Sequence, residues 1–351
     1  MQQNWQVFLT QQGATIVNNS VSHFNALEME LEYSNTTTIL CDLSHYSLIR
    51  VTGAETTNFL QGQLSNDINH VTDTRTQMSA YCSPKGRALA LMRIFKFDDA
   101  YFLSLPSEIA DKTISRLKMF IMRSDVTMED VTEQYFHFGV SGKEAAKNLK
   151  NALDIPALPV NPDEACDAND LSIQKLAGDP ERFELFGSIN NAIPVWEKLK
   201  HLCQPVGQGI WNLQGINAGI PEVLANTSDT FVPQMLNLQL LNAVNFQKGC
   251  YPGQEIVART KYLGKLKKRL YLIEIKTNNS VEIGSDLYES GANQQSIGKV
   301  VLAEMSSANT YRALAVLRIS ALDNQPLFLS DKSGPQLTLL EMPYNLDEDN
   351  T

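Results

Sequence analysis

Cys250 is the residue of this chain with the most informative surroundings for chemistry. It lies in FQKGCYPGQEIVARTKYLGKLKKR, which runs from Phe246 to Arg269. Pro252 suits the first turn of a helix, because its missing N–H would be unpaired there, so the sequence predicts a helix over 253–262. Cys250 would then precede a helix N-terminus, two positions after Lys248. Helix N–H groups and a nearby ammonium both favour thiolate over thiol, which predicts a reactive cysteine.

The alternative for Cys250 is a small buried hydrophobe beside a turn, as free cysteines commonly are. The other four cysteines are widely spaced, at Cys41, Cys82, Cys166 and Cys203. This spacing excludes a CxxC metal clip or a compact disulfide framework, so no metal site is predicted. A Cys–His hydrolase would need a base, but nothing marks any of the five histidines as a partner, and His137 within FHF is interpreted as a core residue.

Basic residues are concentrated just after Cys250. Between Glu255 and Glu274 the charged residues are all cationic: Arg259, Lys261, Lys265, Lys267, Lys268 and Arg269. The whole chain is acidic, with 29 Lys and Arg, 39 Asp and Glu, and a formal net charge of −10. That balance argues against DNA binding through global charge, but a local basic run could contact RNA or a polyglutamate tail. The alternative is a solvated helix end and linker.

Length and composition indicate a globular protein. The chain has 351 residues, of which 43% are hydrophobic and 19% charged, enough for a sizeable core and two or three domains, or one composite domain. The first basic residue is Arg50, so no secretory or transit peptide is indicated. No apolar stretch approaches the ~18 residues of a membrane-spanning helix. We therefore expect a soluble protein that is not exported and makes no membrane contacts.

Two segments share the pattern of a strand, a tight turn and a helix. The matching residues are Val51, Gly53, Glu55 and Leu60 in the first segment and Val140, Gly142, Glu144 and Leu149 in the second. Glycine allows the unusual backbone angles of such a turn, and the preceding Thr or Ser can cap the helix. The sequence thus predicts an internal repeat, with chance recurrence of a common turn as the alternative.

The remaining pattern predicts an α+β protein with antiparallel sheets. A hairpin is expected over 77–82 and 88–97, a strand over 100–105, and a helix from Ser107 with Ile109, Leu117, Phe120 and Ile121 near one face. Strands at 171–176 and 182–186 and a helix at 192–202 follow a connector at 156–170. Short strands separated by turns from Lys268 onward predict a C-terminal antiparallel barrel or sandwich. We expect three regions: 1–155, 156–262 ending in the KGCYPGQE helix, and 263–351.

At the Cys250 window the sequence resembles the folate-binding YgfZ family, relatives of the glycine-cleavage T-protein aminomethyltransferases. The family signature K-G-C-Y-x-G-Q-E is filled by residues 248–255. Supporting segments are FLQGQLSND at 59–67, CSPKGR at 82–87, NAGIP at 217–221, and the stretch FVPQMLNLQLLNAVNFQ at 231–247. The resemblance implies a T-protein-like ring of an α+β body with antiparallel sheets and a C-terminal antiparallel β-barrel.

The resemblance also implies a function. It indicates a cytoplasmic, tetrahydrofolate-binding accessory protein that supports iron–sulfur enzymes and, through one of them, tRNA methylthiolation. Folate and iron–sulfur client enzymes would be its partners, and Cys250 its reactive residue at the folate cavity. The alternative is a folate-dependent aminomethyl or methyl transferase acting on another substrate.

Residues for binding folate are carried over from the family by position. They are Tyr46, Trp211, Lys248, Tyr251, Gln254, Glu255 and Arg259. Tyr46 stands at a position where the family usually carries Trp. A flat pterin suits stacking between two aromatic rings, and each stacking contact contributes on the order of 1 kcal/mol. For both aromatic residues the alternative is ordinary packing in the core. Two carboxylates of true aminomethyltransferases are missing, because 89–92 reads LALM and Asn217 replaces Glu. The glycine-cleavage reaction is therefore not expected.

Overall fold

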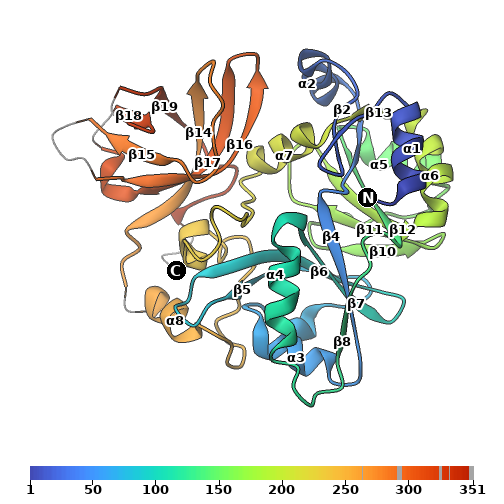
Figure 1. Ribbon diagram of the computed structural model, residues 1–351, viewed down its shortest axis with the longest axis horizontal. Coiled ribbons are helices and arrows are strands. Elements are labelled where there is room, and N and C mark those ends of the chain that lie inside the picture. The colour runs from blue at the N-terminus through green and yellow to red at the C-terminus, as the bar shows by residue number, and fades with distance from the viewer. Residues whose placement is uncertain (263, 291–294, 324–325, 332, 348–351) are drawn as a thin grey trace. The chain divides into compact units, whose positions relative to one another are not determined.

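The computed structural model describes residues 1–262, 264–290, 295–323, 326–331 and 333–347 (Figure 1). The chain forms two compact units, each assembled from separate stretches of sequence. Unit 1 comprises Met1–Thr57, Asn69–Gln77 and Arg93–Asn212, and unit 2 comprises Asn58–Ile68, Met78–Met92 and Leu213–Thr351. These units cut across the three expected regions, because 156–212 belongs to unit 1 whereas 58–68 and 78–92 belong to unit 2. The three-region division stays a prediction.

Unit 1 holds most of the helices. Its elements are α1 Gln3–Gln11, β1 Thr15–Val17, β2 Ser20–His23, α2 Leu27–Thr36, β3 Ile39–Asp42, β4 Tyr46–Thr52, β7 Ala100–Pro106, α4 Ser107–Lys118, β8 Thr127–Asp130, β9 Tyr135–Ser141, α5 Ala145–Leu153, β10 Ala165–Ala168, β11 Leu171–Leu176, β12 Arg182–Ser188, the 3-10 turn Ile189–Asn191, α6 Ala192–Lys200 and β13 Gln204–Val206. Five elements have residues in both units: α3 Thr56–Gln63, the 3-10 turn Ile68–His70, β5 Gln77–Cys82, β6 Ala88–Phe97 and α7 Gln208–Asn217.

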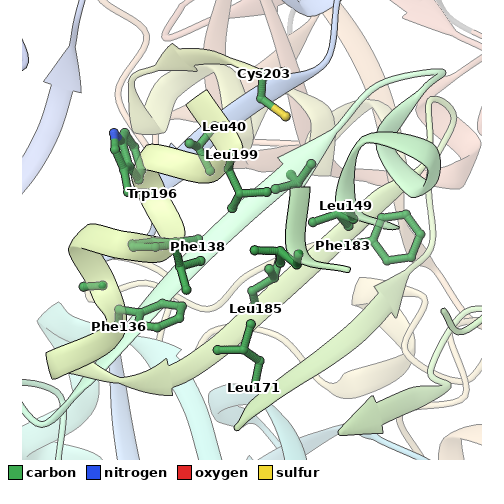
Figure 2. Close-up of a cluster of buried hydrophobic side chains, with 14 of the residues drawn as sticks. Leu40, Phe136, Phe138, Leu149, Leu171, Phe183, Leu185, Trp196, Leu199 and Cys203 are labelled. Carbon is green, nitrogen blue, oxygen red and sulfur yellow. The ribbon is translucent and has the colours of Figure 1, made fainter. Parts of the chain in front are cut away.

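A six-stranded sheet in the order β10-β11-β12-β9-β3-β13 organises unit 1. It is antiparallel except for β13, which pairs with β3 in parallel. One face is apolar and packs against α1, α5 and α6, which lie beside these strands in Figure 1. Figure 2 shows Phe136, Phe138 and Leu185 of the strands meeting Leu149 and Trp196 of the helices. Because successive side chains of a strand point to opposite faces, the residues between these apolar ones point to the other face of the sheet.

The opposite face of the six-stranded sheet packs on a second sheet of unit 1. In that sheet β8, β4 and β7 follow one another, and β6 joins β7 through residues 93–97. Phe186 of β12 packs with Phe95 of β6, their ring centroids 4.4 Å apart, and with Leu48 and Phe102. Residues at this inner layer are therefore shielded from solvent by both sheets, which matters for the polar side chains among them.

The expected repeat is present in the fold. β4 is followed by α3, and β9 is followed by α5, as the sequence pattern predicted. Gly53 and Gly142 occupy the turns with φ of +118° and +148°, in the backbone region that favours glycine. A Cβ at Gly53 would also lie 2.1 Å from the carbonyl oxygen of Asp125. Both positions therefore favour glycine, because the backbone is left-handed there and because neighbouring atoms leave no space for a Cβ.

Unit 2 contains the expected barrel. Its elements are the 3-10 turn Pro233–Leu236, α8 Gln254–Tyr262, β14 Lys268–Lys276, β15 Asp286–Glu289, β16 Gly298–Ser307, β17 Thr310–Arg318, the 3-10 turn Ile319–Ala321, β18 Leu327–Leu329 and β19 Gln336–Leu340. The strands close in the order β14-β17-β16-β15-β18-β19. The α+β class and the C-terminal barrel are confirmed, although β15 is a strand that the sequence pattern did not predict.

One further expectation is corrected by the structure. Helix α4 ends at Lys118, so Phe120 and Ile121 lie beyond it, and Phe120 is 46% exposed instead of buried on the helix face. Ile109 and Leu117 are buried as expected. No described helix is long and apolar enough to cross a membrane.

Candidate functional site

The loop that carries Cys250 is held in unit 2 by the 59–67 segment. Asn245 N–H donates to the carbonyl of Ser65 at 3.0 Å, and Asn66 Nδ2 donates to the carbonyl of Asn242 at 2.6 Å. The Asn245 side-chain oxygen in turn accepts from the backbone N–H of Lys248 at 3.1 Å. The FLQGQLSND and FQKGC segments, distant in sequence, therefore form one hydrogen-bonded structure.

Lys248 is the main anchor of this loop. Its ammonium donates to the carbonyl oxygens of Gln61, Leu64 and Asn66 at 2.7, 2.5 and 2.9 Å. An ammonium has three protons, so these bonds use all of its donors. Burial lowers the pKa of Lys248 to about 8, although the negative charge of Asp67 acts to raise it. The sequence predicts that the Lys248 charge assists Cys250, but the structure directs the ammonium to backbone carbonyls of the 59–67 segment.

Two glycine turns set the position of helix α8. Gly86, in the SPKGR turn between β5 and β6, has φ +70°, and Gly253, just before α8, has φ +80°. A Cβ on Gly253 would lie 2.4 Å from the carbonyl oxygen of Ser83 and 2.6 Å from Cα of Gly86. Only a pair of glycines lets the two backbones approach so closely. The predicted helix is confirmed with its start at Gln254, one residue later than expected.

Cys250 differs from every other cysteine in its access to solvent. It is exposed, whereas Cys41, Cys82 and Cys203 are buried and Cys166 is half-buried. Burial raises the pKa of Cys82 and of Cys203 to about 12 and also raises the pKa of Cys41 and of Cys166. Because of these raised pKa values, the four thiols stay protonated near neutral pH and are poor nucleophiles. The alternative of a buried Cys250 is wrong, and its reactivity stays a prediction.

The other residues of unit 2 that are carried over from the family divide into buried and exposed groups. Tyr251 is buried, with Lys248 Nζ 5.3 Å from its ring centroid, and desolvation followed by the proximity of Cys82 raises its pKa. Gln254 Nε2 donates to the carbonyl of Lys248 at 3.4 Å. Glu255 and Arg259 form an exposed ion pair of 3.0 Å one turn apart on α8. Their assignment to ligand binding stays a prediction based on the family.

Trp211 and Tyr46 lie in unit 1. Trp211, on α7, is 1% exposed, and a Cβ on Gly139 would lie 2.7 Å from its ring atoms Cε3 and Cζ3. The guanidinium carbon of Arg182 is 4.4 Å from the Trp211 ring centroid. Trp211 therefore rests on a glycine of β9 and stacks with a cation.

Tyr46, at the start of β4, lies near the same strand of the six-stranded sheet. Its ring centroid is 5.7 Å from that of His137 on β9 and 4.3 Å from that of His45. His137 and Gly139 are two residues apart on β9 and so share a face. The two expected aromatics thus border one region of unit 1.

Between these aromatics lies a buried polar cluster that the sequence analysis did not identify. His137 Nε2 is 3.4 Å from Glu184 Oε2, both side chains being almost completely buried. Glu184 pairs in register with Gln174, whose side-chain amide has no hydrogen-bond partner among the described residues. Polar residues alternating with Phe183 and Leu185 in RFELFG were the available signal. His137 is buried, as its interpretation as a core residue predicts, and the contact with Glu184 gives it an ionisable neighbour.

Electrostatics keep the cluster in a defined charge state. Burial raises the pKa of the Glu184 carboxyl, but His137 and then Arg93 and Arg182 outweigh this effect and hold its pKa below the usual value. Burial and then the neighbouring His137 lower the pKa of His45 to about 3. The charge of Glu184 and a hydrogen bond with Asn212 act in the opposite direction and raise it. Near neutral pH the cluster therefore contains a carboxylate and an uncharged His45 ring.

The site residues expected from sequence fall into two groups. Tyr46 and Trp211 belong to unit 1, while Lys248, Cys250, Tyr251, Gln254, Glu255 and Arg259 belong to unit 2. The structure also shows the two places where this chain lacks the acidic residues expected of an aminomethyltransferase. Residues 89–92 lie on β6 without a carboxylate, and Asn217 Oδ1 accepts a hydrogen bond from Arg312 at 2.8 Å. Asn217 is thereby engaged as a neutral acceptor.

Known proteins resemble this chain over most of its length. Residues 6–248 match the GCVT N-terminal domain. The tRNA-modifying protein YgfZ of Yersinia enterocolitica is 30% identical over 88% of this chain and 93% of its own length. That of Colwellia psychrerythraea is 29% identical over 88% of this chain and 94% of its own length.

Structural comparison agrees with the sequence relatives. The glycine cleavage system aminomethyltransferase T of Bartonella henselae has a TM-score of 0.81 and 15% identity, covering 98% of this chain and 97% of its own. At that identity the similarity establishes the fold alone. Combined with the GCVT match and the two curated relatives, it shows that this chain belongs to the YgfZ family of tRNA-modifying proteins.

Proposed function

We propose that this protein binds tetrahydrofolate in the cytoplasm and supports tRNA modification by maintaining iron–sulfur enzymes, with Cys250 as its working thiol. The relatives named tRNA-modifying proteins support the tRNA role. The fold shared with an aminomethyltransferase supports a folate ligand.

The polar cluster of unit 1 is the observation that carries the folate proposal. Gln174 is fully buried with both amide atoms unpaired among the described residues, beside the ionised and buried Glu184. Buried polar groups ordinarily have partners, so such atoms mark a place for a ligand. The aminopyrimidinone edge of a pterin offers N–H donors that suit a carboxylate, and both donors and an acceptor that suit an amide. Tyr46, whose ring centroid is 5.7 Å from that of His137, would offer an aromatic surface to the pterin. When bound, the folate would supply a carrier for a one-carbon unit.

Unit 2 contributes the thiol. Cys250 is exposed on a loop that Lys248 anchors through three carbonyl groups, so the sulfur is accessible and its loop is fixed two residues away. A thiol in this setting can act as a nucleophile or as a transient ligand for an iron–sulfur cluster. The transferase alternative would need an ionisable group for proton transfer, and the 89–92 segment supplies none.

Replacing Cys250 separates the two parts of the proposal. We expect Cys250→Ala to bind tetrahydrofolate with unchanged affinity in a calorimetric titration, because the carrying cluster lies in unit 1. The same variant should fail to restore tRNA methylthiolation in cells lacking the protein. Cys166→Ala, a half-buried thiol elsewhere, is the matched control and should restore it. Restoration by Cys250→Ala would remove the thiol from the mechanism, and absence of folate binding by the unmodified protein would refute the ligand.

A further inference from the structure

A face of unit 2 combines cations and aromatic rings around helix α8. Lys85 and Arg87 are exposed in the SPKGR turn, Arg259 and Lys261 on α8, and Lys265 and Lys267 in the segment that follows α8. Together with the aromatic residues Phe246 and Tyr262, these eight residues are called the basic face. On a chain of net charge −10 such a face departs from the average surface. Its residues lie outside the polar cluster of unit 1, and only Arg259 among them is also carried over from the family for folate binding.

The glycine turns bring the two basic segments together. A Cβ on Gly86 would lie 2.8 Å from Cβ of Ile256, in the first turns of α8. Lys85 and Arg87 flank Gly86 and are exposed, so they border the helix that carries Arg259 and Lys261. The sequence indicates only the second basic segment, because Lys85 and Arg259 are far apart in the chain and the packing of Gly86 on α8 brings their segments together.

Aromatic groups lie among these cations. Lys261 Nζ is 4.3 Å from the ring centroid of Phe246, and the centroids of Phe246 and Tyr262 are 6.3 Å apart in an edge-on arrangement. Tyr262 is 64% exposed, which is high for a large ring at a helix end. An aromatic ring fixed by a neighbour and left open to solvent, next to ammonium groups, is the combination that binds unstacked bases and phosphates.

Glu255 and Asp229 are acidic residues close to members of the basic face, and both make contacts. Glu255 pairs with Arg259 at 3.0 Å, and the Asp229 carboxylate accepts the hydroxyl of Ser83 at 2.7 Å. The backbone carbonyl of Asp229 also accepts from Arg87 Nη1 at 3.2 Å. These contacts orient two of the arginines without cancelling the lysine charges.

We infer that the basic face binds single-stranded RNA directly, with lysines and arginines at the phosphates and a base stacked on Tyr262. This goes beyond the proposed function, in which the protein acts on tRNA only through client enzymes, and it does not depend on folate binding. Cys250 stands just ahead of the N-terminal end of α8, whereas Tyr262 ends that helix. At a rise of 1.5 Å per residue, a nine-residue helix separates its ends by roughly 13 Å. The thiol thus precedes the opposite end of α8 from the stacking ring.

Fluorescence anisotropy with a labelled 12-nucleotide oligouridine tests this inference. For the unmodified full-length protein we expect log affinity to fall linearly with log salt. Lys85→Glu with Arg87→Glu should weaken binding at least 10-fold and make the salt slope shallower by about 1.4, two phosphate contacts at about 0.7 each. Tyr262→Ala should weaken binding roughly 5-fold or more with an unchanged slope, because stacking involves no counterion release.

Matched controls decide the interpretation. Lys112→Glu with Lys118→Glu makes the same charge change on exposed residues of α4 in unit 1 and should leave affinity within 2-fold. An equal loss in that control, a flat salt response, or an unaffected Tyr262→Ala variant would each overturn the inference. Equal affinity for the matching oligodeoxyribonucleotide would overturn the assignment to RNA. Unchanged circular dichroism in every variant would confirm that the comparison is between folded proteins.

Discussion

Glu184 illustrates how a buried charge is sustained in unit 1. Its side chain is 9% exposed and lies 3.4 Å from His137, with Arg93 and Arg182 contributing further positive potential. An isolated carboxylate in such a place would take up a proton, but these cations favour its ionised form. The result is a strong acceptor with little water around it, which suits recognition of N–H donors.

Removing that charge should impair folate binding specifically. Glu184→Gln keeps the shape but replaces a charged acceptor, whose hydrogen bonds contribute about 1.5–3 kcal/mol. We expect calorimetric titration to show at least 10-fold weaker tetrahydrofolate binding, with the thermal unfolding midpoint monitored in parallel. Glu197→Gln, which alters a surface ion pair with Lys200 on α6, should bind like the unmodified protein. Equal affinity of both variants would exclude Glu184 from the ligand site.

At the scale of elements, helix α8 depends on contacts between turns. The SPKGR turn and the turn before α8 touch through backbone atoms of Ser83, Gly86 and Gly253. Gln234 Nε2 further donates to the carbonyl of Val257 in α8 at 2.5 Å. The helix therefore owes its position to segments more than 20 residues away in the chain, since its own nine residues bury only Val257.

A single methyl group should disturb this arrangement. Gly253→Ala places a side chain in a left-handed conformation and against backbone atoms that cannot rotate away, so we expect the free energy of unfolding to fall by about 1–3 kcal/mol or more. Urea denaturation provides the measurement. Gly249→Ala, beside Cys250 but with nothing within 4 Å of the added Cβ, should change it by less than about 0.5 kcal/mol. Similar losses in the two variants would contradict the packing argument.

At the scale of the whole molecule, the two units differ in where they bury titratable groups. Unit 1 holds His45, His137 and Glu184 between its sheets, whereas unit 2 buries Lys248 under its loop. A buried histidine with a lowered pKa binds fewer protons in the folded than in the unfolded state, so stability falls as pH decreases below the unfolded value of about 6.5. Unit 1 should therefore be the acid-sensitive part.

Acid unfolding should reveal His45. With a folded pKa of about 3, its burial should cost about 2 kcal/mol of stability at pH 5 relative to pH 7. His45→Gln removes the titrating ring and should flatten the dependence of urea unfolding on pH by about that amount. His23→Gln, an exposed histidine of the same unit, is the control and should leave the profile unchanged. Parallel profiles for His45→Gln and the unmodified protein would contradict the assignment.

The amino-acid sequence by itself determined the elements whose signals are local. Alternating apolar residues predicted the strands around 171–186 and in the barrel, Gly53 and Gly142 marked the repeated turns, and Pro252 marked the start of α8. β15 escaped because it has only four residues, and Phe120 was misplaced because helix periodicity does not show where a helix ends. The signature around Cys250 was likewise a contiguous pattern, so it could be recognised without coordinates.

Tertiary structure alone decided the partners of these residues. Lys248 binds carbonyls of Gln61, Leu64 and Asn66 instead of supporting Cys250, and the exposure of Cys250 follows from a loop held by those contacts. The pairing of Glu184 with His137 depends on the register of β9 and β12, which lie more than 40 residues apart. Hydrogen bonds, desolvation and packing act between groups that chain folding brings close, and spacing along the sequence does not encode those distances.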